Sequence, residues 1–200
     1  MDYSIFIWWI DIVILKEKGE IMPHVITVLA DGFEEVEAVT IIDLLRRAGV
    51  EVTVLGLDSA EVRGAHDLWV RADKLFKEFK GEFDAIVLPG GMPGTNNLAA
   101  SEELLALIRS ARKQNKLCAA ICAAPIVLAK AGILDKVKAT CYPGCESRLT
   151  GAQVVEDAVV ADGNIITSRA AGTAIPFSLK LIEVLAGEET AKKISSGILY

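Results

Sequence analysis

The strongest candidate for chemistry in this 200-residue chain is a cysteine between a short apolar strand and a helix. Residues 116–125 read KLCAAICAAP, and small residues stand on both sides of Cys122. Small neighbours suit a sharp strand-to-helix turn, where the backbone is crowded. At such a turn the free N–H groups of a helix start should lower the pKa of the thiol and can hold an oxyanion. The alternative is a buried structural cysteine, which fits Cys118 better.

Two further segments place candidate groups at the ends of expected strands. The sequence LPGG at 88–91 puts Gly90 and Gly91 after an apolar strand, where glycine lets the backbone approach a ligand closely. The sequence GFEEVE at 32–37 follows the first strand and contains Glu37. Acids in a first helical turn usually interact with the helix dipole, but a carboxyl here could also point into a site.

A fourth segment, SRAAGT at 168–173, follows a later strand and contains Arg169 and Ala170. It could border a site at the strand end. It could equally do no more than cap the next helix, with Thr173 as the N-cap.

The elements that must position these groups alternate along the chain. We expect strands at 24–30, 51–57, 84–91, 116–121, 138–142 and within 154–169, and a hairpin within 61–71. We expect helices at 34–48, 73–79, 101–114, 123–131, 173–185 and 188–196. Alternating strands and helices predict an α/β fold with a mainly parallel sheet, whose ligand sites lie at the carboxyl ends of the strands.

Two of these expectations are specific enough to check residue by residue. In the helix at 34–48, helical spacing places Val36, Val39, Ile42 and Leu45 on one apolar face. Asp162-Gly163 predicts a tight turn between two strands.

The first 21 residues differ from the rest. The apolar run IFIWWIDIVIL at 5–15 is interrupted by Asp11 and is too short to span a bilayer. We expect translation to start at Met22, so that residues 1–21 are an upstream extension and residues 22–200 form a single domain. The alternative is a hydrophobic arm that packs on a partner or a membrane surface.

Composition narrows the class of protein. The chain is 52% hydrophobic and 24% charged, with a net charge of −6, which is typical of a globular domain. An acidic chain without a Lys/Arg cluster is not expected to bind nucleic acid or an anionic membrane. The cysteines at 118, 122, 141 and 145 have poor spacing for zinc, so we expect no metal and a reducing, cytoplasmic location.

Taken together, the four segments resemble the ThiJ/PfpI superfamily, and within it the Parkinson-disease-protein (protein deglycase) branch in its bacterial type. The resemblance covers residues 23–200 and rests on AAICAAP, GFEEVEA with TIIDLLRRAG, VLPGG and the motif TSRxxGT. It implies a flavodoxin-like three-layer α/β sandwich with a nucleophile-elbow cysteine, and a homodimer.

The resemblance also implies roles for individual residues. It makes Cys122 the reactive cysteine and Glu37 a protonated carboxyl that hydrogen-bonds its sulfur. The N–H groups of Gly91 and Ala123 would form the oxyanion site, which Gly90 adjoins. Arg169 and Ala170 belong to the segment expected to border the substrate.

One position departs from the pattern of some family members, which carry a histidine before the proline of the loop after the next strand. Here Tyr142 takes that place, and the two histidines of the chain, His24 and His66, lie outside the motifs. A Cys–His dyad is therefore not expected, and proton transfer must fall to Glu37, Tyr142 or water. A phenol is a weak base near neutral pH, which favours Glu37 with water as carrier. The missing histidine also argues against a glutamine amidotransferase, and Ala123 after the cysteine argues against the peptidase branch.

The resulting function hypothesis is a cofactor-free, cysteine-dependent glyoxalase or deglycase that acts on methylglyoxal-type 2-oxoaldehydes or their early adducts. The alternative is an oxidative-stress sensor or redox-regulated chaperone that uses the same cysteine, with Cys141 or Cys145 as a resolving thiol.

Overall fold

The structure, a computed structural model, describes residues 22–200. The expected extension at 1–21 and its apolar run lie outside the described residues. No helix in the described part of the chain is both long enough and apolar enough to cross a membrane.

A seven-stranded sheet forms the centre of the molecule, with the strand order β10-β11-β7-β6-β1-β2-β5. The strands are β1 (His24–Leu29), β2 (Glu51–Gly56), β5 (Lys74–Leu75), β6 (Ala85–Leu88), β7 (Leu117–Ile121), β10 (Val159–Asp162) and β11 (Ile165–Ser168). Every neighbouring pair is parallel except β10 with β11, which are joined by the predicted turn at Asp162-Gly163. The α/β class with a mainly parallel sheet is therefore confirmed.

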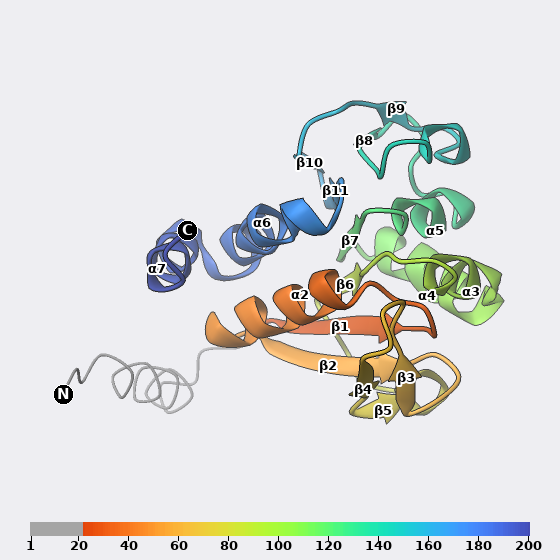
Figure 1. Cartoon of the computed structure of the whole chain (residues 1–200). Helices are drawn as coiled ribbons and strands as arrows, with labels where there is room; N and C mark the ends of the chain where they lie inside the picture. The colour runs from red at the N-terminus through yellow and green to blue at the C-terminus, as the bar shows by residue number, and fades with distance from the viewer. Residues whose placement is uncertain (1–21) are drawn as a thin grey trace.

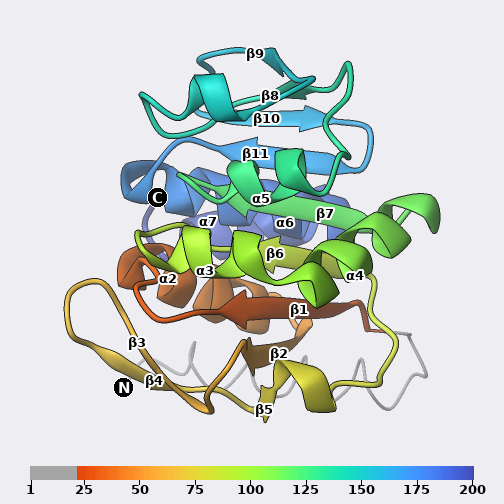
Figure 2. The ribbon, with the colours of Figure 1, turned by 90° about the vertical axis from the view of Figure 1, so that its right-hand side faces the viewer.

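Helices cover both faces of this sheet and make a three-layer sandwich (Figures 1 and 2). One face carries α2 (Glu35–Arg47), α6 (Ala174–Ala186) and α7 (Glu188–Gly197), and the other carries α3 (Gly94–Ala100), α4 (Glu102–Lys113) and α5 (Pro125–Lys130). Alternate strand residues supply the two cores, so that Ile26 packs on the α4 and α5 side and Val25 on the α2 and α6 side.

Two small sheets stand beside the large one. The predicted hairpin consists of β3 (Glu61–Arg63) and β4 (Trp69–Arg71), and β8 (Lys138–Ala139) pairs with β9 (Gln153–Val154). Three single 3-10 turns complete the described elements: η1 (Phe76–Glu78), η2 (Glu146–Arg148) and η3 (Ala171–Thr173). The strand expected at 138–142 is thus limited to its first two residues.

The helix expected at 73–79 does not form. The Asp73 carboxylate accepts the N–H of Val54 at 2.8 Å, and the Asp73 N–H donates to the Val54 carbonyl at the same distance. These bonds hold the chain extended along β2, so it forms the short strand β5 and then only the turn η1.

The apolar face expected for the first helix is also wrong in part. In α2, Val36 is 54% exposed and Val39 is 50% exposed, although Leu45 is buried as expected. The residues buried against the sheet are offset and include Glu37, Ala38 and Ile41. The offset has a chemical cause, because Glu37 is turned inward to hydrogen-bond the backbone after β6.

Candidate active site

Cys122 lies on a sharp turn between β7 and α5, as the small residues around it predicted. Its φ of +64° is in the left-handed region that side chains rarely adopt. Two backbone hydrogen bonds hold it there: its N–H donates to the Ser168 carbonyl at 2.9 Å, and its carbonyl accepts the N–H of Tyr142 at 2.8 Å. The neighbouring strands therefore stabilise a strained elbow that presents the thiol.

Three groups surround the sulfur of Cys122. The backbone N–H groups of Gly91 and Ala123 and the carboxyl of Glu37 all lie within hydrogen-bonding reach of it. Gly91 has a φ of +91°, and a Cβ there would lie 2.4 Å from the Glu34 nitrogen. Only glycine fits this close approach, so the LPGG segment aims a backbone N–H at the sulfur.

The Glu37 carboxyl is fully buried. Its Oε2 accepts the N–H of Gly90 at 2.7 Å, whereas Oε1 has no hydrogen-bond partner among the described residues. A Cβ on Gly90 would lie 2.7 Å from the Cys122 Cβ and 2.9 Å from Glu37 Oε2. An ionised carboxylate would leave Oε1 buried without a donor, while a protonated carboxyl can donate to the neighbouring sulfur.

The pKa of Cys122 differs from the expectation that helix N–H groups would lower it. Burial raises the pKa of Cys122 to about 12, with the Glu37 charge as a further cause, while the N–H groups of Ala123 and Gly91 lower it. The expected effect of the N–H groups is present, but burial and the carboxylate outweigh it. Burial likewise raises the pKa of Glu37 from 4.5 to about 7. A protonated Glu37 no longer repels negative charge on the Cys122 sulfur. The carboxyl and the thiol therefore compete for one proton.

The strand order explains why these residues meet. Cys122 follows β7, Gly90 and Gly91 follow β6, and Glu37 lies in the helix after β1, and these three strands are neighbours at the centre of the sheet. The chain first adds β2 and β5 on one side of β1 and then continues with β6 on the other side. Open α/β sheets form their ligand crevice at such a reversal, which here lies between β1 and β6.

Three further residues were expected to border the site: Tyr142, Arg169 and Ala170. Tyr142 is joined to the elbow through its backbone N–H, and its side chain is half exposed. The Arg169 guanidinium donates to the Glu156 carbonyl at 2.9 Å, and the Ala170 N–H donates to Thr173 Oγ1 at 3.0 Å. Thr173 precedes α6, but its side chain does not cap that helix.

Neither histidine adjoins the sulfur. His24 lies at the start of β1, and its ring nitrogens bond the Glu82 carbonyl at 2.7 Å and Thr53 Oγ1 at 2.8 Å. His66 follows β3, and its Nδ1 lies 2.9 Å from Oε2 of the buried Glu35. Sequence reasoning did not find the contact between Glu35 and His66, because 31 residues separate them.

The remaining cysteines differ in exposure. Cys118 and Cys141 are buried and Cys145 is partly exposed, and all are free thiols. Burial is the main cause that raises the pKa of Cys118 to about 12 and that of Cys141 to about 11. In contrast to Cys122, neither Cys118 nor Cys141 has a backbone N–H group among the described residues that lowers the pKa of its thiol.

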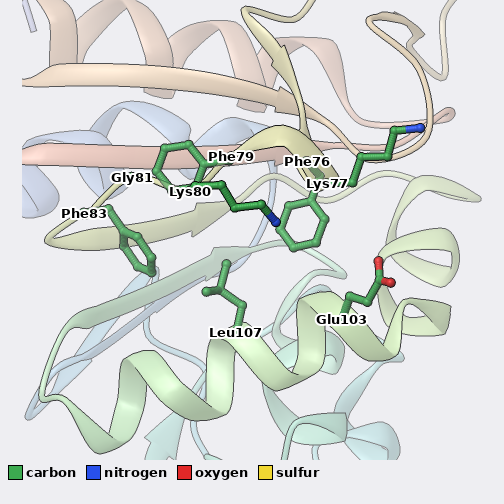
Figure 3. A pocket seen from close by; sticks show the side chains of 8 residues that line it. All are labelled: Phe76, Lys77, Phe79, Lys80, Gly81, Phe83, Glu103 and Leu107. Atoms are coloured by element: carbon green, nitrogen blue, oxygen red, sulfur yellow. The ribbon is translucent and has the colours of Figure 1, made fainter.

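A cavity of about 490 Å³ lies away from this site, between the segment that follows β5 and helix α4 (Figure 3). Three aromatic residues, Phe76, Phe79 and Phe83, line it together with lysine, glutamate, leucine and glycine residues. Phe79 packs edge-on against the ring of His24, at the amino end of β1, whereas Cys122 follows the carboxyl end of β7. The cavity contributes no residue to the cysteine site.

The fold is an α/β sandwich, and its candidate site combines a cysteine on a strand-to-helix elbow, a buried carboxyl and two backbone N–H donors. Fold and site together indicate the class of protein. Residues 23–184 match the model of the DJ-1/PfpI family, and the chain belongs to this family. The resemblance inferred from the motifs is thereby confirmed.

Individual relatives agree with this assignment. The chain is 42% identical to protein dj-1beta of Drosophila melanogaster over 178 residues, which are 87% of this chain and 95% of that one. It is 34% identical to the glutathione-independent glyoxalase DJR-1.2 of Caenorhabditis elegans over 80% of this chain and 87% of that one. The solved structure of oxidized Toxoplasma gondii DJ-1 superimposes with a TM-score of 0.86 at 42% identity, over 89% and 98% of the two chains.

Proposed function

We propose that this protein is a cysteine-dependent glyoxalase or deglycase that converts methylglyoxal-type 2-oxoaldehydes, or their early adducts, to 2-hydroxy acids. The observation that carries the proposal is the Cys122 sulfur enclosed by the Glu37 carboxyl and the N–H groups of Gly91 and Ala123. A family member 34% identical to this chain is named a glutathione-independent glyoxalase, which supports the same class of reaction.

The reaction begins with the Cys122 thiolate, which adds to the aldehyde carbon and forms a hemithioacetal. The Gly91 and Ala123 N–H groups stabilise the oxygen that gains negative charge. Transfer of the Cys122 proton to Glu37 generates the thiolate, and a pKa near 7 lets the carboxyl accept and return a proton at neutral pH.

Glu37 then returns its proton to the hemithioacetal oxygen, takes the hydrogen of the former aldehyde carbon and delivers it to the neighbouring ketone carbon. The former aldehyde carbon loses its hydrogen and becomes a thioester, while the neighbouring ketone carbon becomes an alcohol. Water cleaves the thioester, releases the 2-hydroxy acid and restores the thiol. The oxidation of one carbon balances the reduction of the other, so the net change is the addition of one water.

The test is 2-hydroxy acid formation from methylglyoxal without glutathione, in the intact chain and two variants. Cys122→Ser should abolish turnover, and Glu37→Gln should lower kcat by at least 100-fold, since general acid–base catalysis commonly contributes 10²–10⁴-fold. Cys118→Ser, a buried thiol outside the site, is the matched control and should retain activity. Equal acid formation by Cys122→Ser would refute the proposed role of the thiol.

A redox sensor is the second candidate, supported by a relative solved in an oxidized form. Peroxide would convert Cys122 to the sulfenic acid and a second peroxide would convert that to the sulfinic acid, each releasing one water. Cys141 or Cys145 could instead attack the sulfenic acid, form a disulfide and release water. Peptide mapping after mild peroxide should then show one of these links. A Cys122 that stays reduced would end this proposal.

We also propose a cytoplasmic homodimer. Val36 and Val39 of α2 are half exposed, and Leu68 and Trp69 of the neighbouring hairpin are 60% and 63% exposed. A cleft of about 270 Å³ lined by residues of α2 and β4 shows that these elements lie side by side. We call these four side chains the α2–hairpin patch. A second copy would remove this apolar surface from water. A redox-regulated chaperone, the alternative function, would also need exposed apolar surface of this kind.

A further inference from the structure

Three groups that can ligate a metal meet outside the cysteine site, where the start of α2 faces the turn between β3 and β4. They are the carboxylates of Glu34 and Glu35 and the imidazole of His66, and one ligand atom from each lies within 4.8 Å of the others. The His66 Nδ1 is 2.9 Å from Glu35 Oε2 and 3.8 Å from Glu34 Oε2. The catalytic proposal uses none of these side chains.

The backbone around Glu35 holds its carboxylate in place. Glu35 Oε1 accepts the N–H groups of His66 at 2.6 Å and Leu68 at 3.4 Å, which leaves Oε2 directed at the imidazole. A Cβ on Gly64 would lie 2.2 Å from Oε1, so a larger residue there would displace the Glu35 carboxylate from this position. The Ala65 N–H also donates to the Phe33 carbonyl at 2.8 Å, which joins the hairpin to the start of α2.

Glu34 offers the third ligand atom and is not occupied by other hydrogen bonds in the described part of the chain. Its side chain is only 19% exposed, yet its carboxylate accepts no hydrogen bond from the described residues. Its one charged contact is the imidazole of His66 at 3.8 Å. This carboxylate can therefore bind a cation without losing a hydrogen bond to the described residues. Two further atoms that can ligate a metal lie beside it, one from Glu35 and one from His66.

We propose that Glu34, Glu35 and His66 form a site for one divalent ion of the zinc type. Ligand atoms about 2.0–2.2 Å from a tetrahedral ion stand roughly 3.4 Å from one another. The His66 Nδ1 lies 2.9 and 3.8 Å from the two carboxylate oxygens, on either side of this value. The ion would replace the proton between His66 Nδ1 and Glu35 Oε2, and water would complete the coordination. Imidazole combined with carboxylates favours Zn²⁺ over Mg²⁺ or Ca²⁺, which prefer oxygen ligands alone.

The first test measures affinity by titrating Zn²⁺ into the full chain by calorimetry. Because zinc also binds thiolates, Cys122→Ser is included and should still bind one ion. His66→Ala should weaken binding at least tenfold, and so should Glu34→Gln, whose carboxylate makes no hydrogen bond that the fold could lose. Glu61→Gln, an exposed acid on β3, is the matched control and should bind like the original chain. Unchanged affinity in His66→Ala would overturn the proposal.

The second test locates the ion directly. The chain has only two histidines, and the ring of His24 is held by Glu82 and Thr53 at the start of β1. Paramagnetic Co²⁺ should therefore shift or broaden the imidazole NMR signals of His66 and leave those of His24 unchanged. Both signals unaffected at saturating Co²⁺ would overturn the proposal even if calorimetry detects binding elsewhere.

Discussion

The central interaction at the residue scale is the competition of Cys122 and Glu37 for one proton. Burial is the main cause that raises the pKa of Cys122, and a carboxylate beside the thiol raises it further because it hinders thiolate formation. A protonated carboxyl does the opposite, because it donates a hydrogen bond to sulfur and carries no charge. The reactivity of Cys122 should therefore depend on whether the buried Glu37 is protonated.

This buried carboxyl should make stability depend on pH. The pKa of Glu37 is about 7 in the fold against 4.5 in the unfolded chain, so between these values the folded state binds more protons. The stabilisation is complete below pH 4.5 and is lost as pH rises through 7, an effect of about 3 kcal/mol. Glu37→Gln should remove that decline. Denaturant unfolding of both proteins at pH 4.5, 6 and 8 measures it.

Glu103→Gln is the control for this comparison, since Glu103 lies on α4, away from the site. Its unfolding free energy should follow the original chain at every pH. Parallel pH profiles for the original chain and Glu37→Gln would show that the carboxyl does not bind its proton more tightly in the fold.

The residues of the site could be proposed from sequence because each follows a recognisable strand end. Cys122 has small neighbours, and Gly90 and Gly91 stand in a glycine pair. The direction of the thiol pKa could not be derived, since it depends on burial and on how close a carboxyl 85 positions earlier comes to the sulfur. The Glu35–His66 contact was hidden for the same reason.

At the scale of elements, local signals succeeded where they were strong. Ser101 was expected to begin the helix at 101–114, and its Oγ accepts the N–H of Leu104 at 3.2 Å at the start of α4. The helix α3 was not predicted. It has seven residues, opens with Gly94 and contains two asparagines, which are weak helix formers. Its position against the LPGG segment is set by tertiary contacts.

The Ser101 cap gives a measurable prediction. Ser101→Ala should lower the free energy of unfolding by about 1 kcal/mol, because a free N–H of the first turn loses its acceptor. Ser101→Asp should retain the stability, since its carboxylate can accept the same hydrogen bond. Urea unfolding of the three proteins tests this, and an alanine variant as stable as the original would contradict the capping role.

At the scale of the whole molecule, the α2–hairpin patch should determine the oligomeric state. Val39→Glu would place a charge in the proposed dimer interface. Sedimentation equilibrium should therefore find a monomer for this variant and a dimer for the original chain. Val154→Glu is the control, because this exposed valine lies on β9, at the opposite end of the molecule from the hairpin (Figure 2). A Val39→Glu chain that remains dimeric would place the interface elsewhere.

The two edges of the large sheet have a consequence for behaviour at high concentration. One edge is β5, which has two residues. The other is β10, which has β8 beside it, and the Lys138 N–H of β8 donates to the Asp162 carboxylate of β10 at 2.8 Å. Neither edge offers a long, flat row of free backbone groups that another chain could extend. The protein should therefore resist fibril growth by strand addition, and any assembly should use its helical and hairpin surfaces.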